Sequence, residues 1–589
     1  MAKKTANREQ RREEKAGAAQ RRRIPLWAIG VLVLQLGLML SVFNPVAHNG
    51  GDTAGYVTLA HSLLDRGTYQ DLWEPGQPPH TKYPPFFPIL LAIAISLGAR
   101  TWAALKVVPA LFTTLSVMAV YQWARDRRGA PFAAAVALLT AVSNAVLWAS
   151  HWELSDPPFV AFTFVALWAF ERVTTPRVDG AAAAESDSLT PRLSDTVWLI
   201  VAGVATGLAY STRQAGLPLL VAAAGWLLVN RRVRAAVALG AGIGVPAILW
   251  SLRGNQGAQY VSEFWMIDPY QPDLGRVGIG GLIQRVIDNA VGYVGQWVPI
   301  GYTGMKPGAA VAIIGVVVFA LGIWGWVRHL RRPSVTELFV PMYLGLILLW
   351  PQVWSGDRFA LPIMPLVLFY AGEMVVGFGQ WGGVVVKRIV VTAAIGVLAL
   401  PALVSWGDSA AASKACSSLV DTAGSFSCWG PRTDEFVQAA AWSGAHLPDG
   451  AITLSRKPRI WYVMSGLSSE TFPFTRDAPR FLAFADSIGA HYVVMDYMDS
   501  AASVYVAQAL QDLGGSFCLL QTFGGDARNP PTLLMGILPV DERLNAVTSE
   551  EGNKLDVSMN YCPARMARTP PLAERSGRTQ EIPLLMGFK

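Results

Sequence analysis

The chain has 589 residues, of which 52% are hydrophobic and only 15% are charged, and its net charge is +7. So low a charge content, with apolar runs recurring from residue 24 to residue 406, excludes a soluble globular protein and indicates a polytopic membrane protein. The basic residues before the first run could belong to a nucleic-acid-binding tail. We favour an anchor against anionic lipid, because a span follows directly, and we expect no nucleic-acid partner.

The first apolar run, residues 24–43, is long enough to cross a bilayer. The basic segment 1–23 before it is predicted to be a cytoplasmic tail, and basic residues in later short loops predict which loops lie on that side. These rules give about eleven transmembrane helices up to residue 406. The count leaves out residues 86–97, which are too few to span comfortably. We predict an interfacial helix there, with a true second span as the alternative.

The predicted transmembrane domain, residues 24–406, exposes three loops of interest on its outer side. We place these outer loops at residues 44–100, 150–157 and 253–308. Within the first, residues 54–65 have apolar positions at helical spacing, which predicts a helix on the membrane surface. Glu373 falls inside a predicted span toward the cytoplasm, and we interpret it as a group that packs the bundle.

Residues 407–589 differ in character, with more charge and short alternating strands and helices. They predict an α/β domain outside the cytoplasm. We expect an integral protein of the cell (inner) membrane, with its N-terminus in the cytoplasm. The expected strands are residues 451–454, 491–495 and 516–521, and the expected helices are residues 434–445, 480–487 and 504–513.

All four cysteines lie in this C-terminal region. Such clustering suits a compartment that permits disulfides, and Cys416–Cys428 is the first pair we expect. Free thiols are the alternative.

Asp52 is the candidate with the clearest chemical role, because it emerges just past the first span, at the outer membrane surface. A carboxylate there could take the proton of an acceptor hydroxyl while the hydroxyl attacks a polyprenyl-phosphate sugar. We therefore predict Asp52 as general base. The alternative is that it only caps a helix beginning near Ala54.

Cations would have to hold the departing lipid phosphate. Four basic residues on the outer side are candidates for this donor-phosphate contact: Lys82, Lys106, Arg213 and Arg358. Each has a plainer alternative, except Lys82. Lys106 could snorkel, Arg213 could cap the carbonyls of its own span, and Arg358 could pair with Asp357.

Other polar side chains of the outer loops are candidates for substrate binding: Tyr56, His80, Tyr83, Glu153 and Asp156. Glu153 and Asp156 could instead be ordinary loop residues before Pro157. If they approach Asp52, then Asp52 and Asp156 could hold a divalent metal ion on oxygen ligands. The prediction requires no other cofactor.

Six short segments, in order, resemble motifs of the GT-C superfamily of membrane glycosyltransferases, in the branch of the protein O-mannosyltransferases and aminoarabinose transferases. The segments are residues 52–56, 82–86, 104–107, 152–156, 212–216 and 357–362. The resemblance implies a GT-C-like helical membrane domain, a polyprenyl-phosphate donor, single displacement with inversion, and no nucleotide sugar at the site.

Two positions depart from that branch. Thr53 stands where the branch has a second acidic residue, which puts a metal site or a two-carboxylate mechanism there in doubt. Gly55 stands where an arginine often precedes the tyrosine, so phosphate contact would fall to Lys82, Lys106 or Arg358.

We therefore predict a glycosyltransferase that moves a sugar from a polyprenyl-phosphate donor to a lipid, glycan or protein acceptor outside the cytoplasm. One alternative is another GT-C chemistry, such as a glycan polymerase or ligase. A second is a transporter or flippase of lipid-linked glycans, and a third is an inactive scaffold. A transporter should carry paired repeats and charges deep in the bilayer, whereas here the charges gather at the outer surface.

Overall fold

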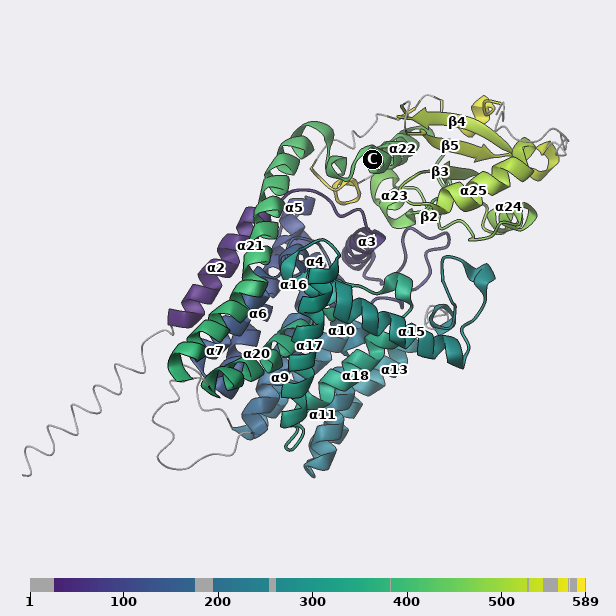
Figure 1. The fold of residues 1–589 in the computed structure, drawn as a ribbon. Helices are drawn as coiled ribbons and strands as arrows, with labels where there is room; N and C mark the ends of the chain where they lie inside the picture. Colours follow the sequence, from purple (N-terminus) through teal and green to yellow (C-terminus); the bar gives the residue numbers. More distant parts are fainter. Residues whose placement is uncertain are drawn as a thin grey trace, which may run out of the picture.

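The computed structural model describes residues 26–174, 194–253, 261–381, 383–526, 529–543, 560–569, 571–572 and 580–587. Long helices form a bundle, and a small sheet with its own helices lies over one end of that bundle (Figure 1). The predicted fold class, a helical membrane bundle with a C-terminal α/β region, is confirmed. The predicted cytoplasmic tail, residues 1–23, lies outside the described residues.

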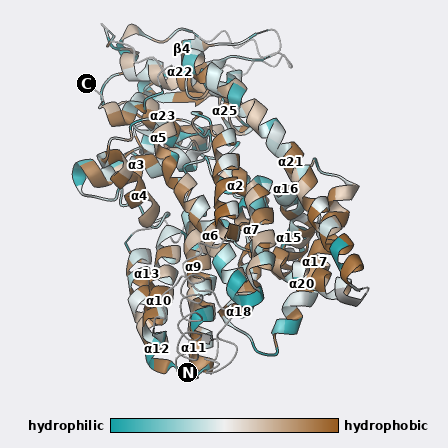
Figure 2. Cartoon of the chain, turned by 90° about the vertical axis from the view of Figure 1, so that its left-hand side faces the viewer, coloured by the Kyte–Doolittle hydropathy of each residue, from teal (hydrophilic) through white to brown (hydrophobic). Residues whose placement is uncertain are grey.

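A bilayer offers no partner for exposed backbone groups, so segments that cross it are helical, and their faces are mostly apolar because lipid tails surround them. Hydrophobic residues make up much of the length of the bundle helices (Figure 2). The helices are α2 (Leu26–Val42), α6 (Val107–Arg128), α7 (Ala130–Val142), α8 (Asn144–Ala149), α9 (Asp156–Thr174), α10 (Asp195–Thr212), α11 (Leu217–Val229), α12 (Val233–Leu239), α13 (Val245–Ser251), α17 (Ala309–His329), α18 (Val335–Leu349), α20 (Met364–Trp381) and α21 (Gly383–Ala423).

Within the described residues, 4 helices are long and apolar enough to cross a membrane by themselves. They are Trp102–Arg128, Val233–Trp250, Ala309–His329 and Gly383–Ala423, and shorter apolar helices of 10–17 residues accompany them. The number of crossings therefore stays a prediction. The boundary expected after residue 406 falls inside α21, which runs on to Ala423.

The first outer loop contains α3 (Gly51–Arg66), α4 (Phe86–Ser96) and α5 (Trp102–Leu105). With 11 residues, α4 is about 16 Å long, roughly half of the hydrocarbon thickness. The predicted helix at residues 54–65 is present as α3. Its apolar side chains, Tyr56 and Leu59 among them, are buried against α4 and against α23 of the C-terminal region.

The C-terminal region holds a five-stranded sheet of order β2-β1-β3-β5-β4, in which β1 pairs in parallel with β2 and β3 while β5 is antiparallel to β3 and β4. The register pairs Thr453 with Tyr492 and Val493 with Met535. The elements are β1 (Thr453–Leu454), β2 (Ser469–Glu470), β3 (Tyr492–Met495), β4 (Phe517–Phe523), β5 (Thr532–Ile537), α22 (Pro431–His446), α23 (Pro458–Ser465), α24 (Ala478–Ser487) and α25 (Ala501–Asp512).

Two disulfides bind this region together. Cys416 at the end of α21 pairs with Cys428, as predicted, and Cys518 of β4 pairs with Cys562. The three expected strands and three expected helices are present, and the sequence patterns missed β2, β5 and α23.

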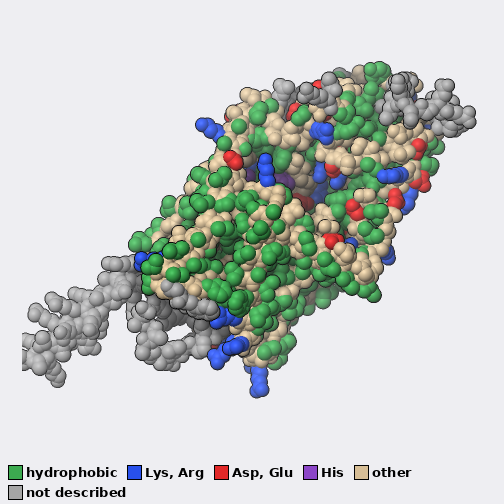
Figure 3. Space-filling model, viewed as in Figure 1, with side chains coloured by type: hydrophobic (Ala, Val, Ile, Leu, Met, Phe, Trp, Pro, Cys, Tyr) green, Lys and Arg blue, Asp and Glu red, His purple; other side chains and the backbone are tan. Residues whose placement is uncertain are grey.

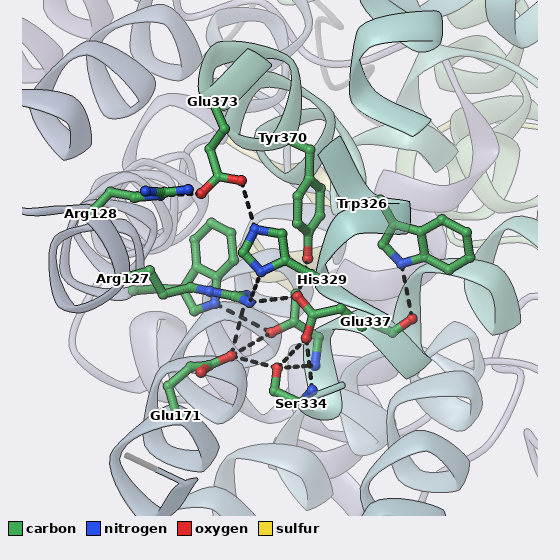
Figure 4. Close-up of polar contacts among 11 residues, drawn as sticks. Arg127, Arg128, Glu171, Trp326, His329, Ser334, Glu337, Tyr370 and Glu373 are labelled. Atoms are coloured by element: carbon green, nitrogen blue, oxygen red, sulfur yellow. Dashed lines mark hydrogen bonds and ion pairs between the residues drawn. The ribbon is translucent and has the colours of Figure 1, made fainter. Parts of the chain in front are cut away.

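Polar side chains join the bundle helices at the end of α6 that lies away from the C-terminal region (Figure 4). Arg127 donates to Glu337 of α18 over 2.5 Å, and Tyr370 of α20 donates to the same carboxylate over 2.6 Å. Glu373 of α20 contacts Arg128 of α6 and, over 2.7 Å, His329 of α17. Glu373 thus links three helices, in keeping with the packing role expected for it.

Candidate active site

A cavity of about 930 Å³ lies between the C-terminal region and the ends of the bundle helices that face it. Its walls come from α3, from the loop before α4, and from the turn between α10 and α11. Residues 262–272, residues 346–354, α19 (Asp357–Ala360) and residues 456–474 complete them. Charged side chains gather in the hollow between the two parts, while the bundle below presents mainly apolar side chains (Figure 3). Segments more than 300 positions apart in the sequence therefore build one site.

Asp52 lies in the first turn of α3, and its side chain is 35% exposed toward this cavity. Its Oδ1 accepts a hydrogen bond from the Tyr83 hydroxyl at 2.7 Å, and its Oδ2 accepts one from Nη1 of Arg358 at 3.1 Å. Nη1 of Arg459 lies 3.6 Å from Oδ1. The alternative that Asp52 caps the helix is wrong, because the N-cap is Gly50 and makes no side-chain cap.

Arg358 bridges two carboxylates. Besides Asp52, it donates from Nε to Oδ2 of Asp156 over 2.7 Å, while Arg213 contacts the other oxygen of Asp156. Asp156 is buried, so it orients two cavity-lining cations from behind. The pairing of Arg358 with Asp357 as its main partner is wrong, because Asp357 accepts from the Arg358 backbone N–H instead. Carbonyl capping by Arg213 is likewise replaced by its contact with Asp156.

The surroundings of Asp52 favour its ionised form. Burial raises the pKa of this carboxyl, but the opposing charges of Arg358 and then Arg459, with the hydrogen bond from Tyr83, outweigh burial and hold it well below its usual range. Burial lowers the pKa of Arg358, yet Asp156 and Asp52 reverse that effect and raise it. Asp52 is thus a carboxylate at neutral pH and can accept a proton.

The aromatic candidates surround this carboxylate. Tyr56 lines the cavity and shares a 2.9 Å hydrogen bond with Ser155, and burial followed by the Asp52 charge raises its pKa to about 12. Tyr83 lines the cavity with its ring centroid 4.9 Å from that of Tyr56. His80 is fully buried behind Tyr83 and fixes that loop: its Nε2 accepts from the Tyr83 backbone N–H at 2.7 Å, and its Nδ1 lies 2.5 Å from Asp71.

The two lysine candidates have different surroundings. Lys82 lines the cavity, with Nζ 3.8 Å from Glu263. Lys106 is fully buried and does not line the cavity. Its Nζ donates to the backbone carbonyls of Asn44 at 2.8 Å and Val46 at 2.5 Å, so it neither snorkels nor reaches the candidate phosphate contacts.

Glu153 is also buried and away from the cavity lining. Its backbone carbonyl accepts from the hydroxyl of Thr53, next to Asp52, at 3.3 Å. Within the described part of the chain its two carboxylate oxygens have no hydrogen-bond partner. Burial raises its pKa to about 7, although the Lys106 charge acts in the opposite direction. Glu153 thus supports the start of α3 from below.

The hypothesis of a divalent metal between Asp52 and Asp156 does not fit these residues. The Arg358 guanidinium lies between the two carboxylates and donates to both, and Tyr83 and Arg213 take further oxygens. Across the described ranges, no group of three or more His, Cys, Asp or Glu side chains could hold a metal ion. The carboxylate oxygens of Asp52 and Asp156 thus accept hydrogen bonds from guanidinium and hydroxyl groups, in place of a metal ion.

The sequence patterns missed a basic cluster from the C-terminal region. Arg456, Lys457 and Arg459 line the cavity, at the start of α23. The signal was available, because three cations within four residues in a predicted outer domain run against the positive-inside rule. The cluster was overlooked because the sequence patterns did not predict α23, the helix at whose start these cations lie.

Residues 79–267 match the model of the family described as Dolichyl-phosphate-mannose-protein mannosyltransferase. A sequence comparison with curated proteins gives no significant match.

Among solved structures, the chain is similar to the oligosaccharyltransferase of Archaeoglobus fulgidus, with 17% identity over 86% of this chain and 74% of that one, at a TM-score of 0.51. It is also similar to ArnT of Cupriavidus metallidurans, with 14% identity over 87% of this chain and 97% of that one, at a TM-score of 0.51. At such identities the likeness establishes the shared fold. Together, the family match over residues 79–267 and the shared fold relate the chain to the membrane glycosyltransferases of the GT-C superfamily, the protein O-mannosyltransferases among them.

Proposed function

We propose that the chain transfers a sugar from a polyprenyl-phosphate-linked donor to a lipid, glycan or protein acceptor outside the cytoplasm, with Asp52 as general base. The observation that carries this proposal is the ionised Asp52 carboxylate, held between Arg358, Arg459 and Tyr83 at the wall of a cavity of about 930 Å³. The likeness to an archaeal oligosaccharyltransferase solved with a dolichol-phosphate, at a TM-score of 0.51, supports the class of donor.

In the proposed reaction, the acceptor hydroxyl oxygen attacks the anomeric carbon of the sugar. The bond from that carbon to the phosphate oxygen breaks, and its electron pair leaves with the polyprenyl phosphate. The hydroxyl proton passes to Asp52, and the anomeric configuration inverts because the displacement is single. No step requires a nucleotide or a metal.

The cations of the cavity would hold the phosphate. We assign this role to Lys82, Arg213 and Arg358 from the predicted set, and add Lys457. Lys457 has no ion pair within 4.0 Å in the described part of the chain, so its ammonium is available to an anion. A bound phosphate would compete with Asp52 for Arg358, which would raise the pKa of Asp52 toward the value a base needs.

We also propose that the cavity faces the outside of the cell (inner) membrane and that the N-terminus is cytoplasmic. A cysteine introduced at exposed Asp65 of α3 tests this, since both cysteine pairs are in disulfides. Labelling of the Asp65→Cys variant in intact cells by a membrane-impermeant maleimide supports the orientation. Labelling only after the membrane is permeabilised contradicts it.

The activity itself is tested with synthetic polyprenyl phosphates that each carry one radiolabelled hexose or pentose, incubated with membranes from cells with and without the gene. Asp52→Asn should lower the transfer rate about 10²–10⁴-fold, because the variant cannot take the hydroxyl proton. The matched control is Asp65→Asn on the same helix, which should leave the rate unchanged.

Three outcomes would contradict the proposal. If Asp52→Asn transfers sugar normally, Asp52 is not the base. If the wild-type protein moves the labelled lipid between leaflets without any transfer, the protein is a transporter. If product analysis finds retention of the anomeric configuration, the single displacement is wrong.

A further inference from the structure

Arg459 lies at the start of α23, yet its side chain reaches into the first outer loop. Its Nη1 donates to the Tyr83 hydroxyl over 2.7 Å and lies 3.6 Å from Oδ1 of Asp52. Its guanidinium also rests on the ring of Trp73, 4.9 Å from the centroid, and lies 5.1 Å from that of Tyr83. One side chain of the C-terminal region therefore contacts three residues of the first outer loop.

The backbone of α3 makes room for this side chain at Gly55. A Cβ at position 55 would lie 2.8 Å from Cδ of Arg459, and 3.3 Å and 3.4 Å from its Nε and Nη1. Gly55 has an ordinary helical conformation, so no backbone strain requires glycine at this position. What the glycine provides is the close approach of the arginine stem to the helix that carries Asp52.

We propose that Arg459 is a positioning residue of the transfer reaction, through which the C-terminal region holds Asp52 and Tyr83 in their catalytic arrangement. The inference rests on the proposed function, in which Asp52 is the base. Arg459 fixes the Tyr83 hydroxyl, Tyr83 donates to Asp52, and Arg459 adds its own charge to the same carboxylate. Docking of the C-terminal region would then complete the site rather than only cover it.

The charges that face Asp52 decide how Arg459 acts. Arg358 of α19 and Arg459 of α23 lie nearest, and Tyr83 donates from the loop before α4. Lys82 and Lys457 act from farther away, whereas burial lowers the pKa of His48 to about 4 and leaves its imidazole neutral at neutral pH. Burial favours the neutral acid, and Arg358 and Arg459 together outweigh it. Without Arg459, burial is opposed mainly by Arg358, so the pKa of Asp52 must rise.

This effect has a readout that a purely structural anchor would not change. The acid limb of kcat against pH, measured at saturating donor, reports the pKa of the essential base in the enzyme–donor complex, where the bound phosphate competes with Asp52 for Arg358. In the Arg459→Met variant this limb should move to higher pH by about one unit, and kcat should fall about tenfold or more. Arg459→Lys keeps a positive charge and should restore much of the position of the limb but less of kcat, because an ammonium lacks the fork of donors.

Gly55→Ala is the second variant, and it keeps every charge. The added methyl would push the arginine stem away from α3, so the limb should shift in the same direction by a smaller amount. Arg480→Met, at an exposed position of α24, is the matched control and should change neither the limb nor kcat. Melting temperatures of all variants separate loss of folding from loss of positioning.

An acid limb that stays in place in both Arg459→Met and Gly55→Ala would overturn the inference. So would a loss of kcat in Arg459→Met that the fall in folded protein accounts for in full. The Asp52→Asn assay separates this failure from failure of the proposed function. If Asp52→Asn abolishes transfer while the Arg459 variants keep the wild-type pH profile, only the role of Arg459 is wrong.

Discussion

Arg358 donates a hydrogen bond from Nη1 to Oδ2 of Asp52 at 3.1 Å, although the two residues are 306 positions apart in the sequence. The same guanidinium uses Nε to reach Asp156 at 2.7 Å. α19, α3 and the start of α9 are therefore fixed to one another through one side chain. Because the guanidinium is planar, its two contacts set the orientation of both carboxylates at once.

Replacing Arg358 by lysine should lower transfer about 10²–10³-fold, the range seen when one charge-stabilising donor is lost. An ammonium is a point charge and cannot reach Asp52 and Asp156 in the geometry of Nη1 and Nε. The measurement is the initial rate against donor concentration, with Arg480→Lys as the exposed control. A rate within about threefold of wild type would contradict the role given to Arg358.

Sidedness made part of this site predictable. The rule that basic loops stay in the cytoplasm places Asp52, Tyr56, Lys82, Arg213 and Arg358 on one side of a membrane. Confinement to one side of the membrane limits how far apart these five residues can lie. The structure brings all five to one cavity. The fold class followed from the low charge content and the recurring apolar runs.

Contacts across the sequence were not predictable in this way. The helix α23 has only 8 residues and begins with Pro458, so its pattern was too short to recognise. Its Arg459 reaches Asp52 only because Gly55 leaves space, and that depends on how two distant elements pack. For Lys106 the sequence predicted too much. Its residue type and its place near the membrane surface suggested a phosphate contact, but its ammonium donates to backbone carbonyls instead.

Replacing Lys106 by methionine should destabilise the fold and leave donor binding intact. The change leaves the buried carbonyls of Asn44 and Val46 without their donor, which costs about 1–3 kcal/mol. Thermal unfolding in detergent and KM for the donor check this. The matched variant is Lys82→Met, whose lysine lines the cavity, and which should raise KM with little change in melting temperature. If Lys106→Met raises KM and Lys82→Met does not, the assignments are reversed.

Replacing Glu153 by glutamine should make the protein less sensitive to alkaline pH. Burial raises the pKa of Glu153 from 4.5 to about 7, so the folded state keeps its proton longer than the unfolded state. The stabilisation by this neutral acid is complete below about pH 4.5, falls as the pH rises toward 7, and is lost above pH 7.

Glutamine has no such proton. As the pH rises from 4.5 to 7, wild type therefore loses unfolding free energy that Glu153→Gln keeps. The difference between the two proteins should shift in favour of the variant by about 3 kcal/mol at most. Denaturant unfolding at pH 4.5 and pH 8 measures the difference, and Glu542→Gln, an exposed acid with a side chain 38% accessible, is the control. A gain that is the same at both pH values would show that Glu153 does not titrate in this range.

Replacing Glu373 by glutamine should loosen the far end of the bundle without affecting transfer. Its carboxylate, only 2% exposed, joins Arg128 and His329 from two other helices (Figure 4). Arg128 is itself 53% exposed, so the loss should be about 1–3 kcal/mol, below the cost of breaking a fully buried pair. The 22 residues of α6 put this contact about 33 Å from the start of that helix, which follows α5 of the first outer loop, and kcat should stay within about twofold of wild type.

The control for Glu373→Gln is Asp195→Asn. Asp195 pairs with Arg232 at 3.7 Å, and the two side chains are 51% and 32% exposed, so loss of this pair should cost under about 1 kcal/mol. Unfolding in detergent and the transfer assay on the folded fraction measure both effects. If the two variants lose the same unfolding free energy, the Glu373 contacts stabilise the fold no more than an exposed ion pair does. If Glu373→Gln lowers kcat at unchanged stability, the two ends of the bundle are coupled through α6 rather than independent.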